Sequence, residues 1–142
     1  MPAESDPSQM NDECYSTLIV PAIGTWPKFD SPLRLGVMAS GTGTNFEALH
    51  NAITCGDLDA QIRVLVVNKT GCGASARAER LGIRCELRDH RLFPTREAMD
   101  EELVRTFQNE GVEAVVMAGW MRIVTPVLIE AFPGKLINIH PS

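Results

Sequence analysis

The sequence lacks the features that mark several large classes of protein. It has no excess of basic residues, since 13 Lys and Arg stand against 18 Asp and Glu, for a formal net charge of -5. Phosphate neutralisation dominates affinity for nucleic acids, so this charge argues against DNA or RNA as the main partner. The longest apolar segment, residues 18–23, is short and interrupted by Pro21, so we expect no membrane span. The acidic residues before it argue against an export signal and favour the cytoplasm.

Cysteine is scarce as well. The four cysteines form no Cys-x-x-Cys pair and have no histidine at zinc-ligand spacing, so the sequence predicts no metal site. Free thiols in a reducing cytosol account for them. Only Cys72 has a second interpretation, because it lies between two glycines just before a predicted helix, where a thiolate is favoured.

The chain divides into two parts of different character. Residues 1–32 contain five prolines, several acidic residues and no sustained periodicity, which predicts a disordered leader. From Leu33 onward, short apolar runs alternate with segments of helical periodicity. We expect strands at residues 33–39, 62–67, 83–87, 114–118 and 136–139, and helices at residues 46–53, 74–81, 95–109 and 126–132. This alternation predicts an α/β domain with a doubly wound, mostly parallel sheet and helices on both faces.

A glycine-rich turn follows the first predicted strand, with the sequence Ser-Gly-Thr-Gly-Thr-Asn at residues 40–45. Glycines let the backbone approach a ligand closely, and Thr44 or Asn45 is placed to cap the helix that follows. The N–H groups at that helix start would attract an anion. The turn lacks a P-loop lysine, has Phe46 in place of a third glycine, and has Asn68 where a dinucleotide fold has an acid. A phosphate monoester therefore fits best, and a tight turn without ligand is the alternative.

A second polar motif ends the printed sequence, Asn-Ile-His-Pro-Ser at residues 138–142. Residues two apart on a strand share a face, so Asn138 and His140 project together while Ile137 and Ile139 pack on the other side. An amide stabilises a developing oxyanion and an imidazole moves a proton near neutral pH, so the pair suits acyl transfer. Taken alone, the motif is equally compatible with a surface histidine next to a turn.

Taken together, four motifs resemble phosphoribosylglycinamide formyltransferase. They lie at residues 40–45, 95–97, 118–123 and 138–142, in the order and with the spacing of that family, and the resemblance covers residues 33–142. The glycine turn is the specific motif, because sibling folate-dependent formyltransferases share only the Asn-x-His-Pro-Ser ending. The resemblance implies a Rossmann-like formyltransferase fold and transfer of a formyl group from 10-formyltetrahydrofolate to glycinamide ribonucleotide, in purine biosynthesis.

The resemblance also assigns roles to individual residues. Gly43, Thr44 and Asn45 would hold the ribonucleotide phosphate. A folate site would be lined by a group that mixes cationic and apolar side chains with an amide: Arg96, Met121, Arg122, Ile123, Val124 and Asn138. Without the resemblance, Met121 and Ile123 read equally well as core residues. Asn138 would orient the formyl carbonyl and stabilise its oxyanion, and His140 would donate the proton.

The family also has a catalytic aspartate downstream of position 142 and later strands that complete the sheet. We therefore expect residues 33–142 to be the phosphate-binding, amino-terminal part of the domain, truncated after the fifth strand and weakly active or inactive alone. Two alternatives remain. One is a module that binds a ribonucleotide phosphate without catalysis; the other is a sibling formyltransferase or deformylase. The acidic charge disfavours a tRNA substrate, and the glycine turn disfavours both siblings. Oligomeric state is not predicted by the sequence.

Overall fold

The computed structural model describes residues 31–139 of the chain. The predicted leader therefore lies outside the described residues except for Ser31 and Pro32. The elements follow one another along the chain as β1 (Leu33–Ala39), α2 (Thr44–Thr54), β2 (Ala60–Val67), α3 (Gly73–Leu81), β3 (Cys85–Leu87), η1 (His90–Leu92), α4 (Arg96–Asn109), β4 (Ala114–Ala118), α5 (Pro126–Ala131) and β5 (Leu136–Ile139).

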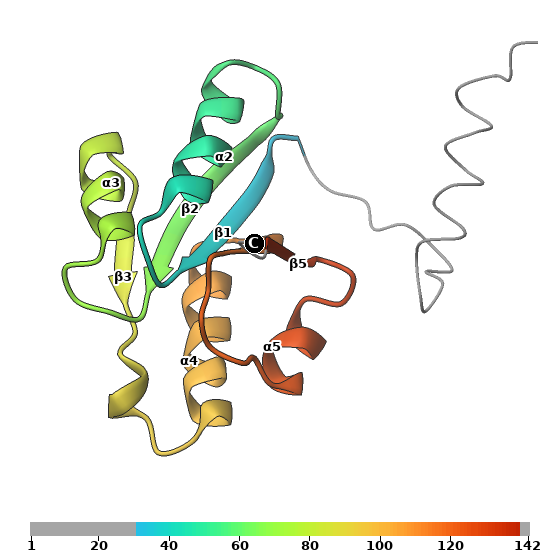
Figure 1. Ribbon diagram of the computed structural model, residues 1–142. Helices are drawn as coiled ribbons and strands as arrows, with labels where there is room; N and C mark the ends of the chain where they lie inside the picture. Colours follow the sequence, from blue (N-terminus) through green and yellow to red (C-terminus); the bar gives the residue numbers. More distant parts are fainter. Residues whose placement is uncertain (1–30, 140–142) are drawn as a thin grey trace, which may run out of the picture.

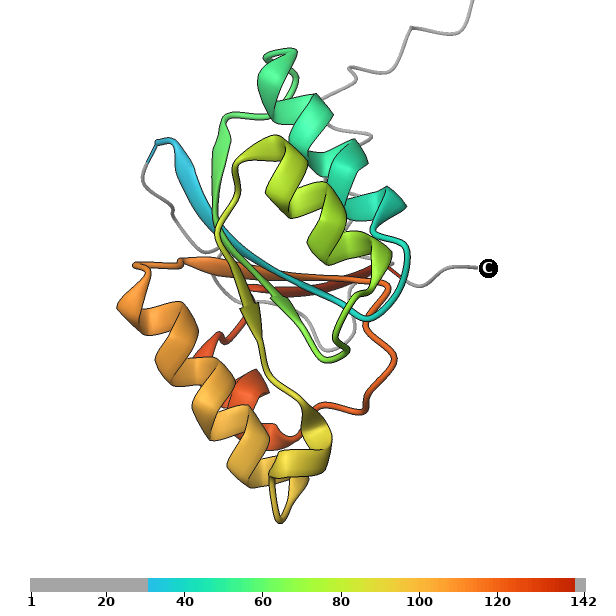
Figure 2. The same cartoon turned by 90° about the vertical axis from the view of Figure 1, so that its left-hand side faces the viewer.

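The five strands form one parallel sheet in the order β3-β2-β1-β4-β5 (Figure 1). Helices α2 and α3 cover one face of this sheet, and α4 and α5 cover the other (Figure 2). The predicted doubly wound α/β fold is thereby confirmed. The chain runs outward from β1 to β3, then crosses back to β4 on the other side of β1.

Both faces are apolar at the centre of the sheet, because β1 and β4 are buried on both sides. On β1, Val37 packs toward α2 and α3 while Met38 packs toward α4 and α5, and neither is exposed to solvent. Such strands read as continuous apolar runs, which is why β1 and β4 are found where the sequence predicts them. On the α4 side, the rings of Phe107 and Phe132 meet edge to face at a centroid distance of 6.0 Å.

One glycine in β1 is required by packing. A Cβ atom added to Gly36 would lie 2.5 Å from the Phe107 ring, so only glycine lets α4 approach the sheet this closely. Overpacking of this kind typically costs about 1–3 kcal/mol. Gly36 therefore fixes the depth at which α4 sits, and with it the start of α4 at the carboxyl edge of the sheet.

Candidate functional site

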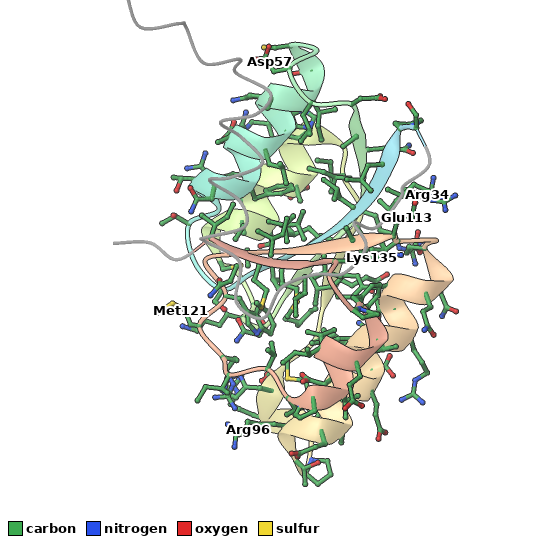
Figure 3. All side chains as sticks on the ribbon, turned by 90° about the vertical axis from the view of Figure 1, so that its right-hand side faces the viewer. Arg34, Asp57, Arg96, Glu113, Met121 and Lys135 are labelled. Carbon is green, nitrogen blue, oxygen red and sulfur yellow. The ribbon has the colours of Figure 1, made fainter. Side chains whose placement is uncertain are left out.

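The site lies where the strand order reverses. Strand β1 is flanked by β2 on one side and β4 on the other, and the segments that follow β1 and β4 lead to helices on opposite faces. In open parallel sheets ligands bind at such a switch point, outside the carboxyl ends of the strands. In Figure 3, Met121, which follows β4, lies at the end of the sheet away from Arg34 and Glu113.

The glycine turn after β1 leads directly into α2. Gly43 is the N-cap of α2, with a φ of 80°, and no side chain caps the helix. The expectation that Thr44 or Asn45 caps the helix is therefore wrong: both lie inside its first turn. The left-handed φ explains this, since glycine adopts it without the steric cost that a residue with a Cβ atom incurs.

The carbonyl groups of residues 41–43 accept hydrogen bonds, whereas the N–H groups of residues 43–45 donate none within the described residues. The carbonyl of Gly41 accepts from the N–H of Ala74 at 3.0 Å, that of Thr42 from Nε of Arg77 at 2.7 Å, and that of Gly43 from the N–H of Glu47 at 2.9 Å. Within residues 31–139, the N–H groups of Gly43, Thr44 and Asn45 donate no hydrogen bond. The turn thus presents donors, together with the positive end of the α2 dipole.

Helix α3 holds the turn in this shape. A Cβ atom on Gly43 would lie 2.6 Å from Cα of Ala74, and one on Gly73 would lie 2.7 Å from the Thr42 carbonyl oxygen. The start of α3 is therefore in direct backbone contact with the turn. Glu47 of α2 forms ion pairs with both Arg77 and Arg80 of α3, which fastens the two helices together.

A cavity of about 310 Å³ opens over the turn. It is lined by the glycine turn, which contains the three predicted phosphate-binding residues, and by residues at or just after the ends of β2 and β4: Ser40, Gly41, Thr42, Gly43, Thr44, Asn45, Lys69, Ala118, Gly119 and Met121. Ser40 joins the two loops, because its N–H donates to the Gly119 carbonyl at 3.1 Å and its Oγ accepts from the N–H of Met121 at 3.0 Å. The structure thus brings Gly43, Thr44 and Asn45 together, and adds Lys69, which the sequence motifs did not indicate.

A second cavity of about 350 Å³ adjoins the first and shares Met121 with it. Its walls come from β4, from the segment after β4 and from β5: Met117, Trp120, Met121, Arg122, Ile123, Val124 and Asn138. Five of the residues predicted for the folate site meet here. Met121 and Ile123 are 69% and 73% exposed, so the alternative that they are core residues is wrong.

Arg96 is the predicted folate residue that the structure places apart. It is the first residue of α4, is exposed, and lines neither cavity. Figure 3 shows it on the α4 side of the molecule, beyond Met121. One turn further along α4, the buried carboxylate of Asp100 accepts from the N–H and the hydroxyl of Thr125, at 2.6 and 2.7 Å. These two hydrogen bonds from Asp100 therefore hold the segment after β4, which lines the second cavity, against α4.

The Asn-x-His motif is described only in part. Asn138 lies on β5 beside Met117 of β4 and lines the second cavity, while His140 lies outside the described residues. The expectation that Ile137 and Ile139 pack on the opposite face is wrong within the described residues, since they are 57% and 37% exposed. They lie on the face of the sheet that α2 and α3 cover, but these two helices do not extend over β5, which is the strand at the opposite edge (Figure 2).

Two pKa shifts among the described residues belong to groups that line neither cavity. Hydrogen bonds from the Arg91 side chain and backbone lower the pKa of Asp89 to about 2. Burial raises the pKa of the Cys85 thiol, and the neighbouring Cys72 adds to the effect. Among residues 31–139, no group of three His, Cys, Asp or Glu is arranged to hold a metal ion, and no helix is long and apolar enough to cross a membrane.

Asn68, at the end of β2, does not face a ligand. Its side chain is 2% exposed, lines neither cavity, and has no hydrogen-bond partner for either amide atom within the described residues. The position that carries the ribose-binding acid in dinucleotide folds is therefore buried here and lines neither cavity.

Comparison with known proteins places this arrangement in a family. The formyl transferase family profile matches residues 33–142. Phosphoribosylglycinamide formyltransferase of Escherichia coli is 33% identical over 110 residues, which cover 78% of this chain and 52% of the relative. Trifunctional purine biosynthetic protein adenosine-3 of Gallus gallus is 37% identical over 78% of this chain and 11% of its own length.

The fold agrees with solved structures of related proteins. Glycinamide ribonucleotide transformylase 1 of Geobacillus kaustophilus superposes with a TM-score of 0.74 at 36% identity, over 78% of this chain and 58% of that one. The transformylase 1 of Symbiobacterium toebii gives a TM-score of 0.75 at 32% identity, over 84% and 57%. The chain thus spans about half the length of the single-function relatives it matches.

Proposed function

Because the chain belongs to the formyl transferase family, we propose that it supplies the amino-terminal part of an enzyme of purine biosynthesis. This enzyme transfers a formyl group from 10-formyltetrahydrofolate to the amine of glycinamide ribonucleotide. The observation that carries the proposal is the pair of adjoining cavities at the carboxyl ends of β1 and β4. One cavity offers free backbone donors for a phosphate, and the other offers apolar walls and an amide.

The first cavity suits the ribonucleotide. The three free N–H groups of Gly43, Thr44 and Asn45 and the dipole of α2 bind the phosphate. With the phosphate over the turn, the ribose and the amine extend toward Met121, the residue that both cavities share. The acceptor amine thereby reaches the edge of the second cavity.

The second cavity suits the folate. The side chains of Met121, Ile123 and Val124 form apolar walls for the pterin ring, and Arg122 supplies a cation for the acidic groups of the folate. Arg96, exposed at the start of α4, is placed outside the cavity and contributes a further cation only where the folate extends beyond it. The formyl group at N10 then lies near Asn138.

The reaction needs an oxyanion donor and a proton carrier. The amine attacks the formyl carbon, and the amide of Asn138 donates to the carbonyl oxygen as it becomes negative. The carbon–N10 bond then breaks, N10 takes up a proton from His140, and the amine releases one. A catalytic aspartate downstream of position 142, which the resemblance implies, would hold the charge on His140. Loss of one oxyanion donor of this kind typically lowers kcat about 10²- to 10³-fold.

The test separates binding from catalysis. Isothermal titration measures binding of glycinamide ribonucleotide and of a 10-formyl folate analogue to the purified chain, and release of the deformylated folate measures transfer. Asn45→Asp places a carboxylate against the phosphate and should abolish ribonucleotide binding. It keeps the size of the side chain, and an acid at a helix start stabilises the helix, so lost binding will not reflect unfolding.

The matched control is Asn51→Asp, the same change at an exposed position near the other end of α2. It should leave binding of both substrates unchanged. Failure of the wild-type chain to bind glycinamide ribonucleotide contradicts the proposal. Binding of ribonucleotide and folate without transfer supports the non-catalytic module instead, and transfer that survives Asn138→Ala unchanged contradicts the role given to that amide.

A further inference from the structure

The cavity over the glycine turn carries a charge opposite to that of the whole chain. Of the residues that line it, Lys69 is the only one with an ionisable side chain, and no Asp or Glu is among them. The chain as a whole has a formal net charge of -5. Glu47, the acid nearest to the turn in sequence, is neutralised by its ion pairs with Arg77 and Arg80. The cavity therefore favours an anion.

The fold brings Lys69 to this cavity from a different strand. Val67 of β2 lies beside Ala39 of β1 in the parallel register, so the residues that follow each strand leave the sheet side by side. Lys69 is therefore held next to Ser40 and Gly41, although 28 residues separate it from Gly41 along the chain. Because Lys69 is exposed, its ammonium group can turn into the cavity.

Lys69 has no structural partner within residues 31–139. Lys69 takes part in no ion pair and in no side-chain hydrogen bond with another described residue. Among residues 31–139, no group competes with a ligand for its ammonium group.

We infer that Lys69 binds the phosphate of the ribonucleotide and makes the site selective for the phosphorylated substrate. The inference rests on the proposed function and extends it by a residue that none of the motifs contains. Backbone N–H groups donate hydrogen bonds but carry only partial charge, whereas the phosphate is close to doubly negative near pH 7. Lys69 supplies the full positive charge that the turn lacks.

The test compares two ligands that differ only in the phosphate. Isothermal titration gives the Kd of glycinamide ribonucleotide, of the corresponding ribonucleoside and of a 10-formyl folate analogue, for the wild-type chain and for Lys69→Gln. Loss of a charge-assisted hydrogen bond should weaken ribonucleotide binding about 10- to 100-fold. Binding of the ribonucleoside and of the folate analogue should not change. Lys69→Arg should restore most of the affinity for the ribonucleotide.

The matched control is Arg105→Gln, which removes one positive charge from the exposed side of α4, where Arg105 pairs only with Glu102. The dependence of Kd on salt gives a second readout, because Lys69→Gln should flatten it and Arg105→Gln should not. If the wild-type chain binds no ribonucleotide, the proposed function and this inference both fall. If it binds and Lys69→Gln binds equally well, only the inference falls. Equal weakening for all three ligands would show a structural role and overturn it as well.

Discussion

Replacement of Gly43 by alanine tests the central geometric feature of the site, the contact between the glycine turn and α3. Gly43 has a φ of 80°, and an added Cβ atom would lie 2.6 Å from Cα and 2.9 Å from Cβ of Ala74. The nearest of these atoms belongs to the backbone, so a change of rotamer cannot relieve the contact. The whole start of α3 must move.

The expected cost follows from two separate terms. An alanine in the left-handed region costs roughly 1–2 kcal/mol. Overpacking against a rigid neighbour adds about 1–3 kcal/mol. Gly43→Ala should therefore lower the free energy of unfolding by about 2–5 kcal/mol, a large part of the 5–15 kcal/mol that is typical of natural domains.

Urea unfolding followed by far-ultraviolet circular dichroism measures this change. The control is Gly41→Ala in the same turn, because Gly41 does not have a positive φ and a Cβ atom there would meet no atom within 4 Å. Its effect should stay within about 0.5 kcal/mol. The double variant Gly43→Ala with Ala74→Gly should recover only the part that the Ala74 Cβ contributes. Equal stabilities of Gly43→Ala and Gly41→Ala would refute the close approach of turn and helix.

Three further outcomes are expected. Asp100→Ala leaves two buried donors of Thr125 without an acceptor, so it should cost about 2–4 kcal/mol in urea unfolding, and a 10-formyl folate analogue should bind more weakly. Arg91→Ala should return the pKa of Asp89 from about 2 toward its ordinary 3.8, measured as the midpoint of the carboxyl carbon shift in NMR. A lowered pKa means that the stabilisation from Asp89 is complete above pH 3.8 and is lost as the pH falls through 2, so the variant should lose pH dependence in that window. Ile137→Ser should change the free energy of unfolding by no more than about 0.5 kcal/mol in urea unfolding, because the side chain is 57% exposed.

The strands were predictable from the sequence to the extent that burial alone defines them. Strands β1, β4 and β5 begin and end at the predicted residues because each is an apolar run bounded by polar residues or glycine. Strand β2 begins two residues earlier than predicted, at Ala60, because it pairs with the start of β1 at Leu33. The pairing depends on the position of β1 in the folded sheet. The polar Gln61 also interrupts the apolar pattern from which the sequence predicts this strand.

The residue types at positions 40–45 predicted the glycine turn, but not the helix that packs against it. The two glycines at residues 41 and 43 indicated an anion-binding helix start, and the structure places a cavity there. The helix begins two residues earlier than its apolar spacing suggested, since Gly43 itself is the N-cap. The contact of the turn with Ala74 was invisible, because nothing near Gly43 in the sequence indicates which helix packs against it.

Lys69 and Asp100 show why the rest of the candidate site could not be predicted without knowledge of the fold. Neither belongs to a motif that predicts its contact: Lys69 follows an ordinary buried strand, and Asp100 reads as an acid placed early in α4 to suit the helix dipole. Their positions depend on strand order, which sets β2 and β4 on either side of β1. Had the crossover after β3 returned to the outer side of β3, β4 would no longer flank β1, and Met121 could not share a cavity with the glycine turn. The sequence motifs name the groups that we propose to bind the ligands, while the order of the strands decides which charges surround them.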